Sequence, residues 1–165
     1  MALLRLRYFG DPVLTTRAQE VDRIDESIRA LAGDMLATMD ASRGIGLAAN
    51  QVGVAKRVFV YGCQGMRGVL INPVWQPVGE AYQTGSEGCL SVPGVRGEVT
   101  RHQDVLARGV DEFGRPVVIR ASGLLARCIQ HETDHLDGVL FLTRMEPAQR
   151  KAAMAEIRAA EWFQA

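Results

Sequence analysis

The chain has 165 residues, which is enough for one domain with its own hydrophobic core. Its 19 basic and 19 acidic residues give a formal net charge of zero, which argues against a general nucleic-acid-binding protein. It has no apolar run of about 18 residues and no apolar leader with a cleavage site. Three scattered cysteines suit a reducing compartment, so we expect a cytoplasmic protein. We also expect one domain over residues 1–165, a monomer by default, and no membrane partner.

The first predicted element is a helix at about residues 26–42, where apolar residues such as Ile28 and Met35 recur at helical spacing. Gly44 ends this helix and begins the glycine-rich segment 44–51. Alternating or β-branched runs then predict strands at residues 57–61, 69–72, 103–110 and 116–120. The turn at 111–114 is expected to join the last two strands as a hairpin.

A second predicted helix follows Ser122, whose hydroxyl can cap its first turn, and ends at Gly138, which suits the left-handed residue after a helix. This helix carries an H-E-x-x-H pattern. His131 and His135 lie one turn apart on the same face, with Glu132 beside them. Apolar neighbours place all three on the buried side, where unpartnered polar groups are costly. The pattern therefore favours a metal site.

A third predicted helix begins with Pro147 in its first turn. Met154, Ile157 and the pair Trp162 and Phe163 give it an apolar surface, which we expect to pack within the molecule. The predicted fold class is α+β, with antiparallel β-sheets around a central helix that carries the H-E-x-x-H pattern, plus an N-terminal and a C-terminal helix.

Two histidines rarely hold a catalytic metal alone, so a third ligand is required. Cys89 lies in a glycine-flanked loop and suits either a ligand or a buried structural thiol. Glu156 is the rival ligand by its spacing, although its surroundings indicate a solvated helix face. We expect His102 at the surface, Cys63 as a free thiol in a loop after a strand, and Cys128 as packing or a pocket wall.

Three separated segments resemble the motifs of bacterial-type peptide deformylases. Residues 44–51 (GIGLAANQ) resemble G-x-G-L-A-A-x-Q, residues 87–91 (EGCLS) match E-G-C-L-S, and residues 130–135 (QHETDH) resemble Q-H-E-x-D-H. Their order and spacing fit, and the resemblance covers nearly the whole chain. The resemblance implies that residues 1–165 form a single catalytic domain.

Carried over position by position, the resemblance implies a role for each matched residue. The metal ligands would be Cys89, His131 and His135. Glu132 would be the general acid and base, and Gln51 and the backbone N–H of Leu90 would stabilise the oxyanion. The extended substrate backbone would lie along Ile45, Gly46 and Gly88. Leu124 and Cys128 are candidate walls of the methionine slot, and Arg96 resembles a family arginine at the rim.

The resemblance implies a hydrolase that removes the N-formyl group from the initiator formyl-methionine of newly made polypeptides and releases formate. A metal-bound water would be the nucleophile. The metal would be Fe²⁺ in the cell, with Zn²⁺, Ni²⁺ or Co²⁺ possible in vitro. The expected partners are formylmethionyl nascent peptides. Whether the terminal helix also contacts the ribosome stays an open question. Two alternatives stay open: a metallopeptidase that uses Glu156 as its third ligand, and a non-catalytic protein that binds peptide N-termini.

Overall fold

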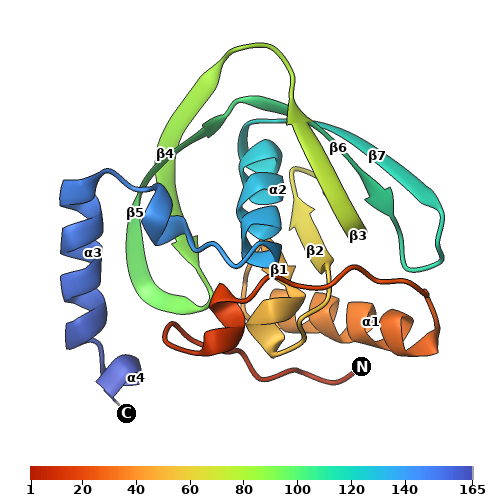
Figure 1. Cartoon of the computed structure of the whole chain (residues 1–165), viewed down its shortest axis with the longest axis horizontal. Coiled ribbons are helices and arrows are strands. Elements are labelled where there is room, and N and C mark those ends of the chain that lie inside the picture. Colours follow the sequence, from red (N-terminus) through yellow and green to blue (C-terminus); the bar gives the residue numbers. More distant parts are fainter. Residues whose placement is uncertain (165) are drawn as a thin grey trace.

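A computed structural model describes residues 1–164 and shows two antiparallel β-sheets on either side of a central helix (Figure 1). The five-stranded sheet has the order β1 (Gly46–Ala48), β2 (Val58–Cys63), β3 (Met66–Pro77), β6 (Asp104–Val110) and β7 (Pro116–Ser122). The second sheet is the hairpin of β4 (Tyr82–Cys89) and β5 (Val92–His102). The central helix is α2 (Gly123–Leu136). The predicted α+β class is therefore confirmed.

The remaining helices lie outside these layers. They are α1 (Glu26–Ala41), α3 (Pro147–Ala159) and the short α4 (Glu161–Gln164), with single 3₁₀ turns η1 (Pro12–Thr15), η2 (Ala49–Val52) and η3 (Phe141–Arg144). Among residues 1–164, no helix combines the length and apolar character needed to cross a bilayer.

The first helix forms where the apolar spacing predicts it. Asp25 caps α1 by accepting a hydrogen bond from the backbone N–H of Ile28. Ile28, Ala32, Met35 and Met39 are buried and pack toward β1 and β2. A helix buried along one stripe in this way gains most of its stability from packing.

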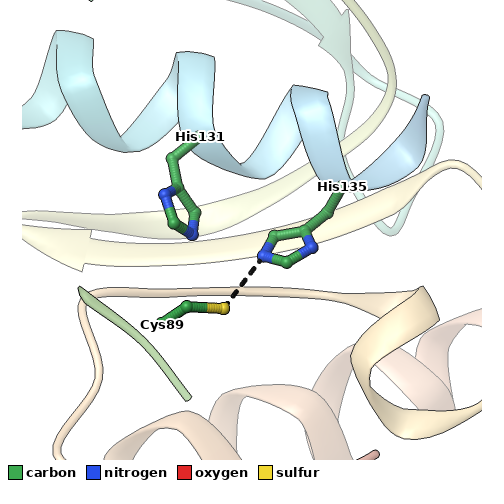
Figure 2. Close-up of side chains that lie close together, drawn as sticks. All are labelled: Cys89, His131 and His135. Atoms are coloured by element: carbon green, nitrogen blue, oxygen red, sulfur yellow. Dashed lines mark hydrogen bonds between the residues drawn. The ribbon is translucent and has the colours of Figure 1, made fainter. Parts of the chain in front are cut away.

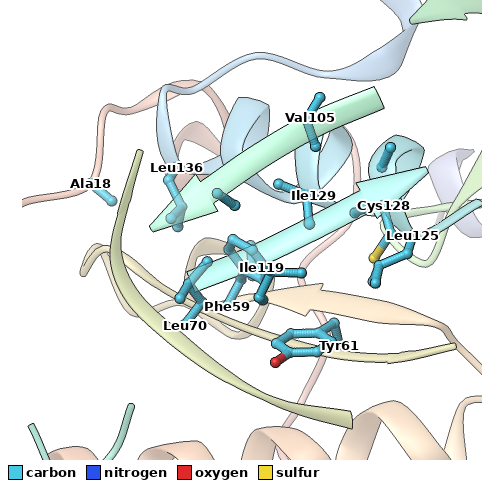
Figure 3. Packing of buried hydrophobic residues seen from close by; sticks show 14 residues of the cluster. Ala18, Phe59, Tyr61, Leu70, Val105, Ile119, Leu125, Cys128, Ile129 and Leu136 are labelled. Carbon is cyan, nitrogen blue, oxygen red and sulfur yellow. The ribbon is translucent and has the colours of Figure 1, made fainter. Parts of the chain in front are cut away.

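The central helix is buried on nearly all sides. Leu125 and Ile129 pack with Phe59, Leu70 and Ile119 of the five-stranded sheet (Figure 3). Each of these side chains stabilises the fold by about 1.5–3 kcal/mol through the removal of apolar surface from water. The helix axis is therefore fixed against the sheet, and residues on its other side keep a constant position.

Both ends of α2 have identifiable causes. Gly138, with φ of 75°, ends the helix as predicted. The prediction that the Ser122 hydroxyl caps the first turn is wrong. Ser122 lies opposite Asp104 in the β6–β7 pair, and its hydroxyl donates to that carboxylate. Gln64 takes the capping role from the β2–β3 turn, because its Oε1 accepts from the Leu125 N–H at 3.2 Å.

The four predicted strands all form, but the β4–β5 hairpin and β1 were not predicted as strands. The 111–114 turn closes the β6–β7 hairpin, with the Gly114 N–H donating to the Asp111 carbonyl at 3.0 Å. Strand β4 contains Gly85 and Gly88, and β5 contains Gly94 and Gly97. Because glycine is depleted in strands, these residues concealed the alternating pattern that would have predicted a hairpin. The hairpin matters because β4 ends at Cys89.

The C-terminal segment packs against the hairpin. Helix α3 begins at Pro147, and Ile157 is fully buried with β5 residues such as Val99. Trp162 lies in the separate helix α4 rather than in α3. Its indole N–H donates to the Pro93 carbonyl at 2.9 Å. Phe163 stays 39 % exposed. The packing within the molecule is therefore confirmed for most of this surface.

Candidate metal centre and active site

Three potential metal ligands from two distant segments meet beside α2 (Figure 2). Cys89 is the last residue of β4, whereas His131 and His135 lie one turn apart on α2. Their ligand atoms all lie within 4.8 Å of one another. The Cys89 Sγ lies 3.3 Å from Nε2 of His135. The prediction that these side chains converge is confirmed.

The chemistry of this donor set fits a transition metal. One thiolate and two imidazoles form a site of intermediate softness, which accepts Zn²⁺ or Fe²⁺. Metal bonds of about 2.0–2.3 Å to nitrogen and sulfur match the observed spacing. Three protein ligands also leave a coordination position open, as catalytic sites require. We therefore regard Cys89, His131 and His135 as residues able to hold one divalent ion.

His131 is oriented by a buried carboxylate. Its Nδ1 lies 2.7 Å from Oε1 of Glu87, which leaves Nε2 available to a metal. Burial alone would raise the pKa of Glu87, but hydrogen bonds from His131 and Arg101 hold that pKa far below its usual value. Glu87 is thus an anion, and His131 donates to it.

Glu87 belongs to a larger buried ion network. Arg101 donates to both Glu87 oxygens, at 2.9 and 3.0 Å, and to Asp134 at 2.7 Å. Arg127 donates to Glu87 and to the Val99 carbonyl. The network links β4, β5 and α2 through charge-assisted hydrogen bonds. It therefore ties the Cys89 strand to the histidine helix.

The pKa values of the two histidines are shifted in opposite directions. Burial lowers the pKa of His131, but hydrogen bonds with Cys89 and Glu87 outweigh it and raise the pKa well above its usual value. Burial and the charge of His131 lower the pKa of His135 well below the usual value. His131 therefore holds a proton more tightly than His135 does.

Glu132 lies at the floor of the site with no partner for one oxygen. It is only 4 % exposed, and its Oε1 has no hydrogen bond within residues 1–164. Burial is the largest effect on this side chain and raises the pKa of Glu132 to about 7. A carboxyl group that titrates near neutral pH can both accept and return a proton.

Gln51 is buried, and its amide is held at both ends. Its Oε1 accepts from the Ala48 N–H at 2.9 Å. Its Nε2 lies 3.1 Å from the Ser91 Oγ and 3.6 Å from the Cys89 Sγ. The amide donor therefore faces the metal ligands, and its orientation is set by the backbone of β1.

A cavity of about 490 Å³ opens beside these groups. Its lining includes eleven of the predicted site residues: Ile45, Gly46, Gln51, Gly88, Cys89, Leu90, Arg96, Leu124, Cys128, His131 and Glu132. The twelfth, His135, is 1 % exposed and contacts Cys89. Leu124 remains 44 % exposed, and Ile45 remains 40 % exposed. The structure thus brings the predicted residues around one cavity.

Gly46 is required by the closeness of β1 to α2. A Cβ at Gly46 would lie 2.6 Å from Oε2 of Glu132 and 2.8 Å from Sγ of Cys128. Any side chain there would displace Glu132 or the cavity wall. Cys128 itself has a pKa raised well above the usual value by a hydrogen bond with Cys63 and by burial, so it presents a neutral thiol.

Two of the minor predictions need correction. Cys63 is a free thiol, but it is the last residue of β2 rather than part of a loop. His102 is half-buried because its ring contacts Trp75 and Tyr82, and Tyr82 is its cross-strand partner in the unpredicted β4. The rival ligand Glu156 is exposed on α3 and does not belong to the metal-ligating group.

Sequence reasoning missed the ion network around Glu87. Arg127 and Asp134 could have indicated this network, since each is a charged residue on a helix whose other residues are predicted to be buried. Arg101 gave no such signal because β5 was not predicted. Arg43, which also lines the cavity, was missed as well.

Comparison with known proteins agrees with this geometry. Residues 3–151 match the family model of polypeptide deformylase. The chain is 59 % identical to peptide deformylase 1 of Corynebacterium efficiens, over 99 % of both chains. Its structure resembles a peptide deformylase from Synechococcus elongatus in complex with actinonin, with a TM-score of 0.88 and 45 % identity, covering 93 % of this chain and 85 % of that one.

A second solved structure extends the likeness over nearly all of both chains. A peptide deformylase from Ehrlichia chaffeensis, also in complex with actinonin, gives a TM-score of 0.92 at 37 % identity, covering 98 % of this chain and 99 % of that one. The chain therefore belongs to the polypeptide deformylase family, whose members are enzymes that remove the N-formyl group from nascent peptides.

Proposed function

We propose that this enzyme hydrolyses the formyl amide of formyl-methionyl peptides with one divalent metal ion held by Cys89, His131 and His135. The observation that supports this most directly is the convergence of the three ligand atoms within 4.8 Å, beside the cavity that Cys89 and His131 line. When bound, a divalent cation polarises the formyl carbonyl and lowers the pKa of water toward neutrality.

Glu132 is the proton carrier in this proposal. Its carboxylate takes a proton from the attacking water and returns it to the methionine nitrogen as the amide breaks. Burial, which raises the pKa of Glu132 to about 7, matches it to both steps. Its unpartnered Oε1 leaves an acceptor for that water. The products are formate and a free N-terminal methionine.

Two donors stabilise the negative charge that develops on the formyl oxygen. The Gln51 Nε2 is fixed beside Cys89, because its carbonyl end is bonded to the Ala48 N–H. The backbone N–H of Leu90 follows the ligand Cys89 directly. One such donor contributes about 3 kcal/mol to the transition state.

The substrate is gripped mainly through its backbone. Strand β1 is the edge of the five-stranded sheet and, within residues 1–164, pairs only with β2. An extended peptide can therefore lie along Ile45 and Gly46 and across the cavity from Gly88. Leu124, the neutral thiol of Cys128 and the His131 ring wall an apolar slot for methionine.

The finer assignments follow from the chemistry of the site and its substrate. We propose Fe²⁺ as the metal in the cell, with Zn²⁺, Ni²⁺ or Co²⁺ able to occupy the site in vitro. We propose a monomer that works in the cytoplasm, where formylated chains emerge. A ribosome contact would use the exposed face of α3, which carries Arg150, Lys151 and Arg158.

Formate release from formyl-Met-Ala-Ser by anaerobically iron-loaded protein tests the proposal. Turnover supports it, whereas metal-loaded protein that binds the peptide without releasing formate would favour a binding protein. Cys89→Ala and Glu156→Ala test the ligand set. Metal content should fall only in Cys89→Ala, and loss only in Glu156→Ala would overturn the assignment.

A further inference from the structure

Two arginines at the cavity have no ion-pair partner. Arg43 directly precedes the 44–46 segment and Arg96 lies on β5, so the two arginines line the cavity from two separate segments. Both side chains belong to exposed residues, and neither forms a salt bridge within residues 1–164. The mouth of the cavity therefore carries two uncompensated positive charges.

The acidic residues of the cavity cannot neutralise them. The carboxylate of Glu87 already forms salt bridges with Arg101, Arg127 and His131. Glu132 also lines the cavity, but it is only 4 % exposed and lies at the cavity floor rather than at the mouth. No other acidic residue among those described lines the cavity. Since the whole chain has a net charge of zero, the positive field is a local property of this mouth.

Hydrogen bonds hold the guanidinium of Arg96 and the backbone of Arg43 in place. Arg96 donates from Nε to Oγ of Ser86 at 3.0 Å and from Nη2 to the Ser86 carbonyl at 3.3 Å. Its Nη1 lies over Gly88, where a Cβ would be only 2.6 Å away. In the other segment, hydrogen bonds to the end of α1 fix the backbone of Arg43 and Gly44, at 3.1 Å to Asp40 and 2.9 Å to Met39.

Building on the proposed deformylase function, we propose that Arg43 and Arg96 make the enzyme prefer formyl-methionyl peptides with an acidic residue directly after the methionine. An extended peptide projects successive side chains to opposite sides. The side chain that follows the methionine therefore points away from the methionine slot, and two lining segments of the cavity each carry a guanidinium that it can meet. Carboxylates are attracted there, and lysine or arginine is repelled.

Amidated peptides test this preference without a terminal carboxylate. The series is formyl-Met-X-Ser-amide and formyl-Met-Ala-X-amide, with X as Asp, Ala or Lys. We expect kcat/KM for Asp to exceed that for Lys by about tenfold at low salt, equivalent to ~1.4 kcal/mol. The ratio should shrink toward one in about 1 M salt, where the Debye length falls to about 3 Å. An Asp-to-Lys ratio of one or below at low salt in the formyl-Met-X-Ser-amide series overturns the inference.

Charge variants separate an electrostatic role from a structural one. Arg43→Glu and Arg96→Glu should each reduce the Asp-to-Lys ratio, and the double variant should invert it. Arg43→Lys and Arg96→Lys keep the charge and should keep the preference. The matched control is Arg120→Glu on the exposed face of β7, which should leave the ratio unchanged. An equal change in the control would show a general charge effect and overturn the assignment.

A binding measurement gives a second readout. Calorimetry with the product peptides Met-Asp-Ser-amide and Met-Lys-Ser-amide should show tighter binding of the acidic peptide, and equal affinities would contradict the inference. The outcomes also separate the two proposals. Turnover of the alanine peptide with no charge preference removes only the role of the arginines. No formate from any peptide removes the proposed function, and the inference with it.

Discussion

Nδ1 of His131 donates to the Glu87 carboxylate at 2.7 Å, so a residue two positions before the thiol ligand orients the histidine ligand of a distant helix. Glu87 points into the ion network while Cys89 reaches the metal-ligating group from the same strand. Carboxylates that hold metal-binding histidines in this way set the ring orientation and raise its basicity. Geometry in the centre therefore depends on a side chain that is not itself a ligand.

Glu87→Gln should weaken metal binding about 10- to 100-fold, since the ring of His131 loses its anionic acceptor. Competition with a chromophoric chelator measures this affinity. Glu98→Gln on the exposed side of β5 is the control and should bind metal normally. Equal affinities in the two variants would show that Glu87 does not support the site. Urea unfolding separates the effect from lost stability, because Arg101 and Arg127 become unpaired.

Glu132→Gln should retain the metal but lower kcat by about 10²- to 10⁴-fold, because the amide cannot carry a proton. Glutamine keeps the size of the side chain in the tight space beside Gly46. Metal content by elemental analysis and formate release measure the two properties. Near-normal turnover with full metal content would remove Glu132 from the mechanism.

Gln51→Ala should lower kcat about 10²- to 10³-fold, because an oxyanion donor is lost from a buried position. Gln51→Glu is the informative companion, since it preserves shape and replaces the donor by an acceptor. Both variants should be impaired in kcat at saturating substrate. A fully active Gln51→Glu enzyme would contradict a donor role.

Gly46→Ala should reduce kcat/KM by about 10²-fold, because its Cβ would meet Oε2 of Glu132 at 2.6 Å and misplace the carboxylate. Gly33→Ala in α1 is the control. Its Cβ would lie 3.6 Å from Sδ of Met1, an ordinary contact, and should stabilise the helix by up to ~1 kcal/mol with unchanged activity. Thermal unfolding and kcat/KM distinguish the two glycines, and unimpaired Gly46→Ala would contradict the close approach.

Metal affinity should rise with pH across the neutral range. Without a metal, burial lowers the pKa of His131, but Cys89 and Glu87 outweigh it and raise that pKa well above its usual value. The ring therefore binds a proton below the raised pKa, and the metal must displace it from Nε2. His131 alone contributes a slope of about one log unit of affinity per pH unit. Calorimetry in buffers of different ionisation enthalpy measures the released protons, and binding without proton release would contradict the prediction.

Local patterns predicted much of the fold. Apolar spacing located α1 to within one residue of its observed end, and the strand patterns located β2, β3, β6 and β7. The pleat and the helical period act between near neighbours, so they leave a trace in the sequence. The β4–β5 hairpin left little trace because its stability comes from cross-strand pairing and from the charges it buries against α2.

The sequence by itself predicted the candidate site, because H-E-x-x-H spacing places His131, Glu132 and His135 on neighbouring rows of one helix. Three motifs in order placed Cys89 and Gln51 beside them by resemblance, and their catalytic roles remain predictions. Only the tertiary structure decided what supports and surrounds these groups. Glu87, Arg101 and Asp134 are far apart in the chain, and no local periodicity couples them. Once buried, these charged groups must pair with one another, because an unpaired buried charge is costly. They become buried only when the two sheets pack against the helix.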